Sequence, residues 1–463
     1  MEKMKKDSFL IVGSGGRECA FALKLFEDTI LHAFVSHKNP AIIECVEKSG
    51  GKYIVGNVNN AKDVASFAKE NNIDYAFVSA DDPLSNGVID EMLNYNIKAV
   101  GGTKAATKIE WDKIYSIDMM QKVCPGFTPY YQSIENKKDL PSAIQMFKEK
   151  GMQIVVKPQG LTGGKGVKVM PEHLKDYSDC VNYASELLDK CPNEKVLLVE
   201  KLKGIEFTVM GITDGENLVM SPASYDYPFR FKNDLGAGTG GMGCFTNNEK
   251  KLPFMNNKDL QDCQDIMQKI IDEMRNDGLS FSGVLNGGFF KTKEGIKFME
   301  FNGRFGDPEG LNILTILESS FADLIRDMWH KTLSENKVSF IKKASVIKYL
   351  VAKEYPQESA KATVFTMDKE AINELGVNIF FASSIKTSDN QYQTLKKSRA
   401  IAIGAIADKI EEAGDLVNQA IERFVHTDLE YRSDIGSKEN LDKLLNYDFK
   451  NKPKNRAKPL SKM

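Results

Sequence analysis

Short apolar runs alternate with segments of helical periodicity over the first hundred residues. Strands are predicted at Phe9–Val12, Ala33–Ser36, Tyr75–Ser79 and Lys98–Val100, and helices at Glu18–Phe26, Ala61–Asn71 and Val88–Asn94. This alternation is typical of a parallel sheet with helices packed on its faces. The pattern therefore predicts an α/β fold that begins with a parallel-sheet domain, which we place at residues 1–110.

The pattern changes after residue 110. A helix is predicted over 113–123, and prolines with a polar stretch behind them mark the start of a new unit. Three strands and one helix are predicted next, at Gln153–Lys157, Gly166–Val169, Lys195–Glu200 and Asp176–Lys190. We interpret residues of about 125–202 as a small α+β lid within a larger domain that covers 111–335.

The rest of the chain contains a predicted hairpin, a helix and a smaller domain. Strands at Gly283–Lys291 and Ile296–Phe301 are joined by a short turn, and a helix is predicted near Ile316–Thr332. Residues 336–445 then read as a smaller C-terminal α/β domain with a helix at Ile410–Val425.

Composition excludes several classes of protein. Hydrophobic residues make up 42% and charged residues 27% of the 463 residues, as in a globular protein large enough for several domains. The formal charge of −2 gives no electrostatic reason for nucleic acid or an anionic membrane as a partner. Only the tail, 446–463, is strongly basic. It lacks apolar periodicity, so we expect it to be disordered.

The cysteines and the apolar runs favour a cytoplasmic protein. The seven cysteines are scattered, odd in number and without a CxxC pair, which predicts neither a disulfide framework nor a zinc site. No apolar run approaches the roughly 20 residues that span a bilayer, and the start of the chain does not read as a signal peptide. We expect small-molecule partners and a monomer or weak homodimer.

The first glycine-rich loop, Gly13-Ser-Gly-Gly-Arg-Glu18, follows a predicted strand and opens a helix. Backbone N–H groups at a helix N-terminus point at an anion, so the loop is a candidate for phosphate binding. It does not match the dinucleotide fingerprint, because Glu18 stands where a third glycine belongs. A tight structural turn explains the loop equally well.

A lysine at the end of an apolar strand precedes the second loop. Lys157 is followed by Gly160, Gly163, Gly164 and Gly166. Such a lysine reaches phosphate oxygens as a point charge, and the glycines let the backbone close over a nucleotide. The loop is not a Walker A loop, because no Ser or Thr follows the last lysine. A plain hairpin turn is the alternative.

Another apolar strand ends at Glu200, and Glu206 lies a few residues beyond it. The backbone of the connector can form hydrogen bonds with an adenine, and a carboxylate can accept hydrogen bonds from the ribose hydroxyl groups. Two exposed acids at a strand end would give the same pattern. A further loop, Gly238-Thr-Gly-Gly-Met-Gly243, exposes its backbone and is functional only if it meets the other loops in space.

The second strand of the hairpin carries the most specific signal. Glu300 and Asn302 point to the same face, as two hard oxygen ligands suited to a Mg²⁺ ion that also bridges nucleotide phosphates. Arg304 falls on that side if the strand continues, ready for a carboxylate or phosphate. Asp307 and Glu309 add charge beyond it. Because phenylalanines alternate with these charges, unlike in a surface cluster, we predict a catalytic site.

Taken in this order, the segments resemble the glycinamide ribonucleotide synthetase family of the ATP-grasp superfamily over residues 8–437. The matching segments are Gly13–Glu18, Asp82-Pro-Leu84, Lys104-Ala-Ala106, Trp111-Asp-Lys113, Val156–Gly166, Glu200–Glu206, Thr239–Gly243, Glu300-Phe-Asn302, Arg304–Glu309 and Tyr431–Gly436. The resemblance implies a pre-ATP-grasp N domain, an ATP-grasp core whose lid closes over ATP, and a C-terminal domain that completes the cleft. It implies a ligase that joins glycine to 5-phosphoribosylamine in purine biosynthesis through a glycyl phosphate.

The resemblance also implies roles for individual residues. ATP would contact Lys113, Lys157, Gly163, Gly164, the adenine-binding Glu200, Lys201, Leu202 and Lys203, and the ribose-binding Glu206. Mg²⁺ or Mn²⁺ would bind Glu300 and Asn302. Glycine would lie near Arg304 and Asp307, which with Lys157 are the expected catalytic residues. The phosphoribosyl group would lie near Gly15, Gly16, Arg17, Glu18, Asp226, Gly240 and Gly241.

One loop departs from the family pattern. The family has Asp-His-Lys-Arg where this chain has Asp226-Tyr-Pro-Phe229, so two positive charges are missing. Arg230 and Lys232 are the candidates to replace them, since a long side chain can absorb a shift of one to three residues. The departure bears on the acceptor amine more than on the use of ATP.

Two other functions stay open at this stage. One is an ATP-grasp ligase that joins another small carboxylate and amine. The other is a catalytically silent nucleotide-binding protein, against which the retention of Lys157, Glu300 and Asn302 argues. Biotin carboxylase fits worse at the first glycine-rich loop and at Arg304–Glu309.

Overall fold

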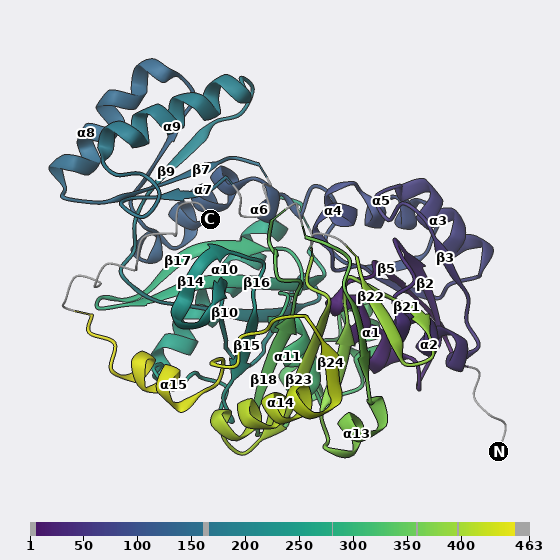
Figure 1. Cartoon of the computed structure of the whole chain (residues 1–463). Helices are drawn as coiled ribbons and strands as arrows, with labels where there is room; N and C mark the ends of the chain where they lie inside the picture. Colours follow the sequence, from purple (N-terminus) through teal and green to yellow (C-terminus); the bar gives the residue numbers. More distant parts are fainter. Residues whose placement is uncertain (1–5, 161–165, 280, 358–359, 396–397, 450–463) are drawn as a thin grey trace.

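The N-terminal part of the chain folds around a parallel sheet in the computed structural model, which describes residues 6–160, 166–279, 281–357, 360–395 and 398–449. The strand order is β3-β2-β1-β4-β5, with bounds Tyr53–Val55, Ile30–Val35, Ser8–Val12, Tyr75–Phe77 and Lys98–Val100, and Figure 1 labels β2, β3 and β5 of this sheet. The helices of this part are α1 (Gly16–Leu25), α2 (Pro40–Ser49), α3 (Ala61–Glu70), α4 (Asp81–Ser85) and α5 (Val88–Asn94). The predicted parallel-sheet start of an α/β fold is confirmed.

Alternate side chains of β1 pack against different helices. Phe9 and Ile11 belong to the buried cluster that includes α1 and α2, whereas Leu10 and Val12 belong to the cluster formed with α3 and α5. Successive side chains of a strand point to opposite faces, so helices cover both faces of this sheet. The sequence prediction omitted α2 and the short edge strand β3.

A small antiparallel sheet with two helices forms the lid. The strand order is β6-β9-β7-β8, with bounds Tyr131–Ile134, Val196–Glu200, Ile154–Pro158 and Lys168–Val169, and the helices are α8 (Leu140–Glu149) and α9 (Tyr177–Lys190). This unit projects from the rest of the molecule in Figure 1. Ile154 and Val156 pack against the helices. Lys157 therefore points the other way, toward β17, where its Nζ lies 3.5 Å from the carbonyl oxygen of Met299.

The largest sheet is antiparallel and joins the middle of the chain to its C-terminal part. The order β17-β16-β10-β12-β15-β18-β23-β20, with β11 beside β10, corresponds to Gly295–Asn302, Gly283–Thr292, Gly204–Thr213, Ser224–Asp226, Gly243–Thr246, Ala344–Leu350, Ile401–Ala407, Asn378–Phe381 and Leu218–Met220. The predicted hairpin is present as β16 and β17. Backbone pairing of β15 with β18 ties the C-terminal strands to the core sheet.

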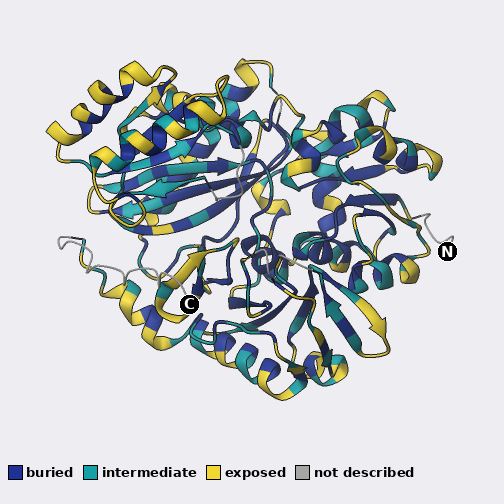
Figure 2. Cartoon of the chain, turned by 45° about the horizontal axis from the view of Figure 1, so that its top comes forward, coloured by how far each residue is buried: buried dark blue, intermediate teal, exposed yellow. Residues whose placement is uncertain are grey.

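Helices pack against this sheet, and their bounds are α6 (Lys108–Trp111), α7 (Lys113–Val123), α10 (Asn257–Asn276), α11 (Glu309–Ile316) and α14 (Ile410–Phe424). The helix α12 (Phe321–His330) packs instead on α1 and on β4 and β5 of the N-terminal sheet. The helix predicted near Ile316–Thr332 is present as α12, whereas α11, which ends at Ile316, was not predicted. α12 starts anew because the side chain of Ser320 accepts a hydrogen bond from the backbone N–H of Asp323 and so caps it. Figure 2 shows that the sheet strands are mostly buried while the outward faces of the peripheral helices are exposed.

The remaining elements are short. They are β13 (Phe229–Phe231), β14 (Leu235–Gly238), β21 (Ser384–Ser388), β22 (Gln391–Thr394), β19 (Val364–Met367), β24 (Val425–Thr427), α13 (Lys369–Glu374), α15 (Lys438–Leu445), η1 (Pro125–Phe127), η2 (Lys137–Asp139), η3 (Lys232–Asp234) and η4 (Glu335–Lys337). Within the described ranges, none of the helices combines the length and the hydropathy that crossing a membrane demands. The predicted disorder of the tail from residue 450 onward concerns positions outside those ranges.

A lysine is buried where β18 packs on α14. Nζ of Lys348 donates hydrogen bonds to Oδ1 of Asn418 at 2.7 Å and to the carbonyl oxygens of Gly414 at 3.0 Å and Ser433 at 3.1 Å. All three acceptors are uncharged. Burial therefore lowers the pKa of Lys348 from 10.5 to about 7, although nearby acids such as Asp415 partly offset the effect.

We predict that Lys348 makes stability depend on pH above neutrality. Between its folded pKa of about 7 and its ordinary value of 10.5, the unfolded chain binds a proton that the folded chain does not. The free energy of unfolding should rise with pH in this window, by up to about 1.4 kcal/mol per pH unit. The contribution of Lys348 to stability is lost as the pH falls through about 7. Denaturant unfolding of wild type and Lys348→Met at several pH values in this window measures the free energy of unfolding of each protein. If the free energy changes with pH equally in both proteins, the prediction is wrong.

Candidate active site

A cleft opens where the N-terminal sheet, the lid, the large sheet and the C-terminal strands meet. A cavity of about 970 Å³ is lined by Gly15, Arg17, Glu18, Asp81, Glu110, Lys113, Lys157, Gly240, Glu300, Asn302, Arg304, Asp307 and Arg399, among others. A second cavity of about 170 Å³ is lined by Glu206, Asp226, Asn286, Glu309 and, in common with the first, Glu300, Asn302, Arg304 and Asp307. Most of the predicted site residues therefore share one continuous cleft.

The two predicted phosphate-binding lysines lie close together. Lys113 begins α7, directly after the helix cap Asp112, and its Nζ donates to the carbonyl oxygen of Gly160 at 2.6 Å. Burial lowers the pKa of Lys113, the carboxylate of Glu300 raises it, and the charge of Lys157 lowers it further. Two cations that influence each other beside one carboxylate suit a polyphosphate chain and a metal ion.

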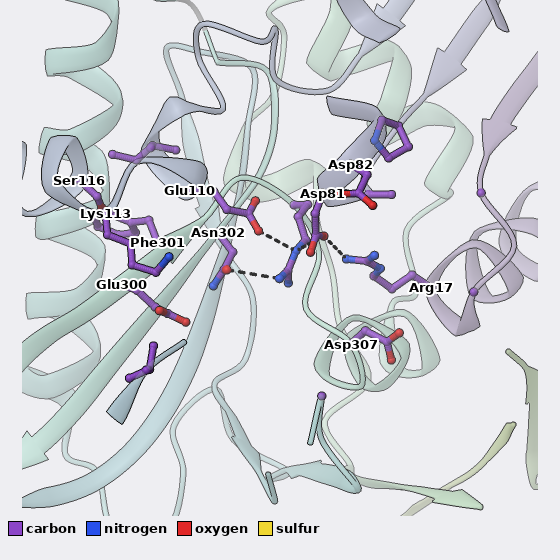
Figure 3. A pocket seen from close by; sticks show the side chains of 18 of the residues that line it. Arg17, Asp81, Asp82, Glu110, Lys113, Ser116, Glu300, Phe301, Asn302 and Asp307 are labelled. Carbon is purple, nitrogen blue, oxygen red and sulfur yellow. Dashed lines mark hydrogen bonds and ion pairs between the residues drawn. The ribbon is translucent and has the colours of Figure 1, made fainter. Parts of the chain in front are cut away.

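The alternation of β17 places its two oxygen ligands on one face. Glu300 pairs with Gly288 and Asn302 with Asn286 in the neighbouring strand, so both side chains point into the cleft. Figure 3 shows Glu300 on the side of Lys113, with Asn302 nearer the middle of the cavity. Oδ1 of Asn302 accepts a hydrogen bond from Nη2 of Arg304 at 3.3 Å.

Arg304 is held by acids from two other elements. Its Nε forms ion pairs with Oδ1 of Asp81 at 2.7 Å and with Oε1 of Glu110 at 3.2 Å. Arg17 shares the same carboxylate, with Nη1 at 3.2 Å from Oδ1 of Asp81 (Figure 3). Burial alone would raise the pKa of Asp81, but the two guanidinium groups hold it well below its ordinary value. Burial raises the pKa of Glu110, although Arg304 partly offsets the rise.

Glu18 lines the cavity but also shapes its own loop. Its Oε2 accepts a hydrogen bond from the backbone N–H of Gly15 at 2.8 Å and so caps α1. Gly13 has φ +125°, and a Cβ atom there would lie 2.8 Å from the Glu18 side chain. Position 13 therefore favours glycine, and Glu18 serves this loop as its cap. Gly16 is buried behind the cavity.

The end of β12 contributes an acid, Asp226, and the loop between β14 and β15 contributes two glycines. Burial and the neighbouring Glu309 raise the pKa of Asp226 well above its ordinary value, while Arg399 lowers it. Gly241 has φ +99°, and a Cβ atom there would lie 2.7 Å from Oδ1 of Asp226. Gly241 therefore lies directly behind Asp226, and Gly240 lines the cavities.

Several predicted nucleotide contacts lie elsewhere or outside the described ranges. Glu200, Lys201, Leu202 and Lys203 line neither cavity as the described residues form them. They follow β9, where Nζ of Lys201 forms an ion pair with Oε1 of Glu172 at 2.5 Å. The predictions for Gly163 and Gly164 fall on residues that the structure does not describe.

Sequence reasoning missed Asp81, Glu110 and Arg399. Asp81 follows the carboxyl end of β4, the edge of a parallel sheet where ligands bind, and this position could have drawn attention to it. Arg399 precedes β23, and its Nη1 donates to the carbonyl oxygens of Asp307 at 2.8 Å and Gly241 at 3.0 Å and contacts that of Gly240. No local pattern marks it.

The structure contradicts the replacement of the missing loop charges by Arg230 or Lys232. Arg230 is 2% exposed and lies on β13, pointing away from the cleft. Its Nε donates to the carbonyl oxygen of Tyr355 at 2.9 Å, and its Nη2 pairs with Oε2 of Glu430 at 2.7 Å. Lys232 is exposed and lines neither cavity of the described residues. Arg399 is the cation that contacts the loop instead.

A lid over an antiparallel sheet, with paired lysines facing a Glu-x-Asn strand, defines the ATP-grasp class of ligases. Comparison with known families gives matches to the phosphoribosylglycinamide synthetase N domain at residues 7–110, its ATP-grasp (A) domain at 111–310 and its C domain at 345–438. The chain belongs to the phosphoribosylglycinamide synthetase family.

Relatives agree with this assignment, and solved structures share the fold. The chain is 37% identical over 438 residues to the phosphoribosylamine–glycine ligase of Methanocaldococcus jannaschii, covering 94% of this chain and 97% of that protein. It is 35% identical to the same ligase of Methanobrevibacter smithii, with the same shares covered. The phosphoribosylamine–glycine ligase structure from Thermotoga maritima has a TM-score of 0.75 at 23% identity, covering 92% of this chain and 100% of that one. A biotin carboxylase from Campylobacter jejuni shares the fold, with a TM-score of 0.71 at 14% identity and coverage of 96% and 98%.

We predict that Arg230 serves stability and not substrate recognition. Arg230→Gln should lower the free energy of unfolding by about 2 kcal/mol, because the buried carbonyl oxygen of Tyr355 and the carboxylate of Glu430 lose a charged donor. Michaelis constants for every substrate should stay within about twofold. Denaturant unfolding tests the loss of stability, and steady-state kinetics test the Michaelis constants. A selective rise in the Michaelis constant for the acceptor amine would contradict the prediction.

Proposed function

We propose that this enzyme joins glycine to 5-phosphoribosylamine with ATP, giving glycinamide ribonucleotide, ADP and phosphate. The observation that carries the proposal is the cleft itself. It collects Lys113, Lys157 and Glu300 for a nucleotide next to Arg304 and Asp307, which suit a small amino acid. The relatives that share the whole length of the chain are named for this reaction.

The chemistry follows from the charges in the cleft. A carboxylate is a poor electrophile, so ATP first phosphorylates glycine to glycyl phosphate and releases ADP. The amine of phosphoribosylamine then attacks the acyl carbon, and phosphate leaves. Lys113 and Lys157 neutralise the phosphate oxygens, while Arg304, fixed by Asp81 and Glu110, pairs with the glycine carboxylate. The lid keeps water from the acyl phosphate.

The residues present fit a divalent metal ion. Glu300 and Asn302 offer two oxygen donors on the cleft face of β17. Within the described part of the chain, no group of three His, Cys, Asp or Glu side chains could hold a metal ion. This suits Mg²⁺ or Mn²⁺, since Mg²⁺ at nucleotide sites is held by one or two protein ligands and the substrate phosphates. When bound, the ion supplies positive charge to those phosphates.

The remaining assignments complete the proposal. The connector Glu200–Lys203 binds the adenine and Glu206 the ribose after the lid closes. The phosphoribosyl group lies near the loop Gly15–Glu18 and near Asp226, Gly240 and Gly241, where Arg399, itself paired with Asp307, contacts the loop carbonyl oxygens. The protein acts in the cytoplasm as a monomer or weak homodimer on small molecules. Its domains divide near residues 110, 335 and 445.

We predict that phosphate release from ATP requires both glycine and 5-phosphoribosylamine. Assays with each, both and neither test this, with glycinamide ribonucleotide identified as the product. Robust turnover with another amine and none with 5-phosphoribosylamine would overturn the assignment.

Lys157→Met should cut turnover by roughly 100-fold without unfolding the protein, because one charge at the phosphates is lost. Lys195→Met is the matched control, since Lys195 is an exposed lid lysine paired with Glu135.

We further predict that Glu300→Ala and Asn302→Ala raise the Mg²⁺ concentration for half-maximal turnover by at least about tenfold, because each removes one of two protein ligands. ADP binding should change much less. A Mg²⁺ titration of the phosphate-release assay measures the shift. Glu294→Ala, at the exposed turn of the same hairpin, is the control. Wild-type titration curves in both variants would show that the metal binds elsewhere.

A further inference from the structure

The hydroxyl group of Tyr349, from the C-terminal part of the chain, contacts a carboxylate that lines the cleft. Tyr349 lies on β18, is 0% exposed and donates a hydrogen bond to Oδ1 of Asp307 at 2.7 Å. The loop that opens α1 leaves room for this contact, because a Cβ atom at Gly16 would lie 2.1 Å from the Tyr349 hydroxyl oxygen. Glycine at position 16 thus lets the N-terminal and C-terminal parts meet beside Asp307.

Arg399 holds the other oxygen of the same carboxylate. Its Nη2 pairs with Oδ2 of Asp307 at 3.0 Å. Its guanidinium group also lies over the ring of Tyr349, 4.4 Å from the ring centroid. Rotation of the Asp307 side chain would break both the tyrosine hydrogen bond and the ion pair. The carboxylate therefore has one preferred orientation.

Asp307 keeps hydrogen-bond acceptor positions for a substrate. A carboxylate has about four acceptor positions, and Tyr349 and Arg399 use one on each oxygen. Asp307 lines both cavities of the cleft. Burial and the charge of Asp307 raise the pKa of Tyr349 well above its ordinary value, so its hydroxyl remains a donor to the carboxylate. A compact cation with several N–H donors, such as an amino acid ammonium group, suits the positions that remain.

We propose that Tyr349 is a positioning residue that orients Asp307 to bind the ammonium group of glycine. The inference rests on the proposed function, since it takes glycine as the amino acid substrate. Tyr349 acts through Asp307 and does not touch glycine, while Arg399 supports the same carboxylate from its other side. Lys113 and Lys157 lie on other elements, so a loss at Tyr349 affects glycine and leaves nucleotide binding intact.

The substitution Tyr349→Phe removes the hydroxyl and keeps the ring. We expect the KM for glycine to rise about tenfold, as one hydrogen bond to a charged group is lost, while the KM for ATP and for 5-phosphoribosylamine stays within about twofold. Tyr392→Phe is the matched control, because this buried tyrosine of the C-terminal part packs on Phe365 and Phe381 and lines neither cavity of the described residues. It should leave every KM unchanged.

Glycine binding without turnover separates positioning from general damage. Isothermal calorimetry with a non-hydrolysable ATP analogue gives the glycine Kd for wild type, Tyr349→Phe, Asp307→Asn and the double variant. If Tyr349 acts through Asp307, adding Tyr349→Phe to Asp307→Asn weakens glycine binding no further. Additive losses, or equal losses for all three substrates with a lower Tm, would overturn the inference.

The same measurements distinguish this inference from the proposed function. Wild-type protein that neither binds glycine nor releases phosphate with glycine and 5-phosphoribosylamine overturns both. Normal wild-type turnover with unchanged glycine binding in Tyr349→Phe overturns the positioning role alone.

Discussion

The ion pairs around Arg304 hold the halves of the cleft in one geometry. The guanidinium lies between Asp81 of the N-terminal part and Glu110 of α6, and Arg17 of α1 shares Asp81. Glu110 also accepts a hydrogen bond from the backbone N–H of Gly303 at 2.8 Å, which ties α6 to the end of β17. Burying charges is costly unless each is paired, so loss of one partner destabilises the others. The start of α1 and the end of β17 therefore depend on one cluster of paired charges.

Local sequence patterns predicted most of the elements and which side chains of β7 and β17 share the cleft. The continuous apolar run Phe9–Val12 indicates a strand covered on both faces, and the structure shows helices on each. A strand period of 2 places Glu300 and Asn302 on one face, and the same period turns Lys157 away from the lid helices toward β17. These inferences succeed because they need only neighbours within one element.

Contacts between distant segments could not be predicted in the same way. Arg399 and Gly240 are 159 residues apart in the sequence, and Glu110 and Gly303 are 193 residues apart. In the sequence, a single charged residue beside a strand gives the same pattern whether its side chain faces solvent or a cleft. Tyr349 was equally hidden, because it stands in an apolar strand whose alternation does not reveal which side chain lies next to Asp307.

Neither arginine near the altered segment, 226–229, simply replaces the missing positive charges. Arg230 lies on β13 and bonds to Glu430 and to the backbone of the C-terminal part instead of entering the cleft. The arginine thereby anchors the hairpin, while Arg399 contacts the loop carbonyl groups from the other side. Arg399 is itself paired with Asp307, so it brings little net charge to the loop. In the proposed reaction, the change at 226–229 therefore leaves the other loop assigned to the phosphoribosyl group, Gly15–Glu18, unaltered.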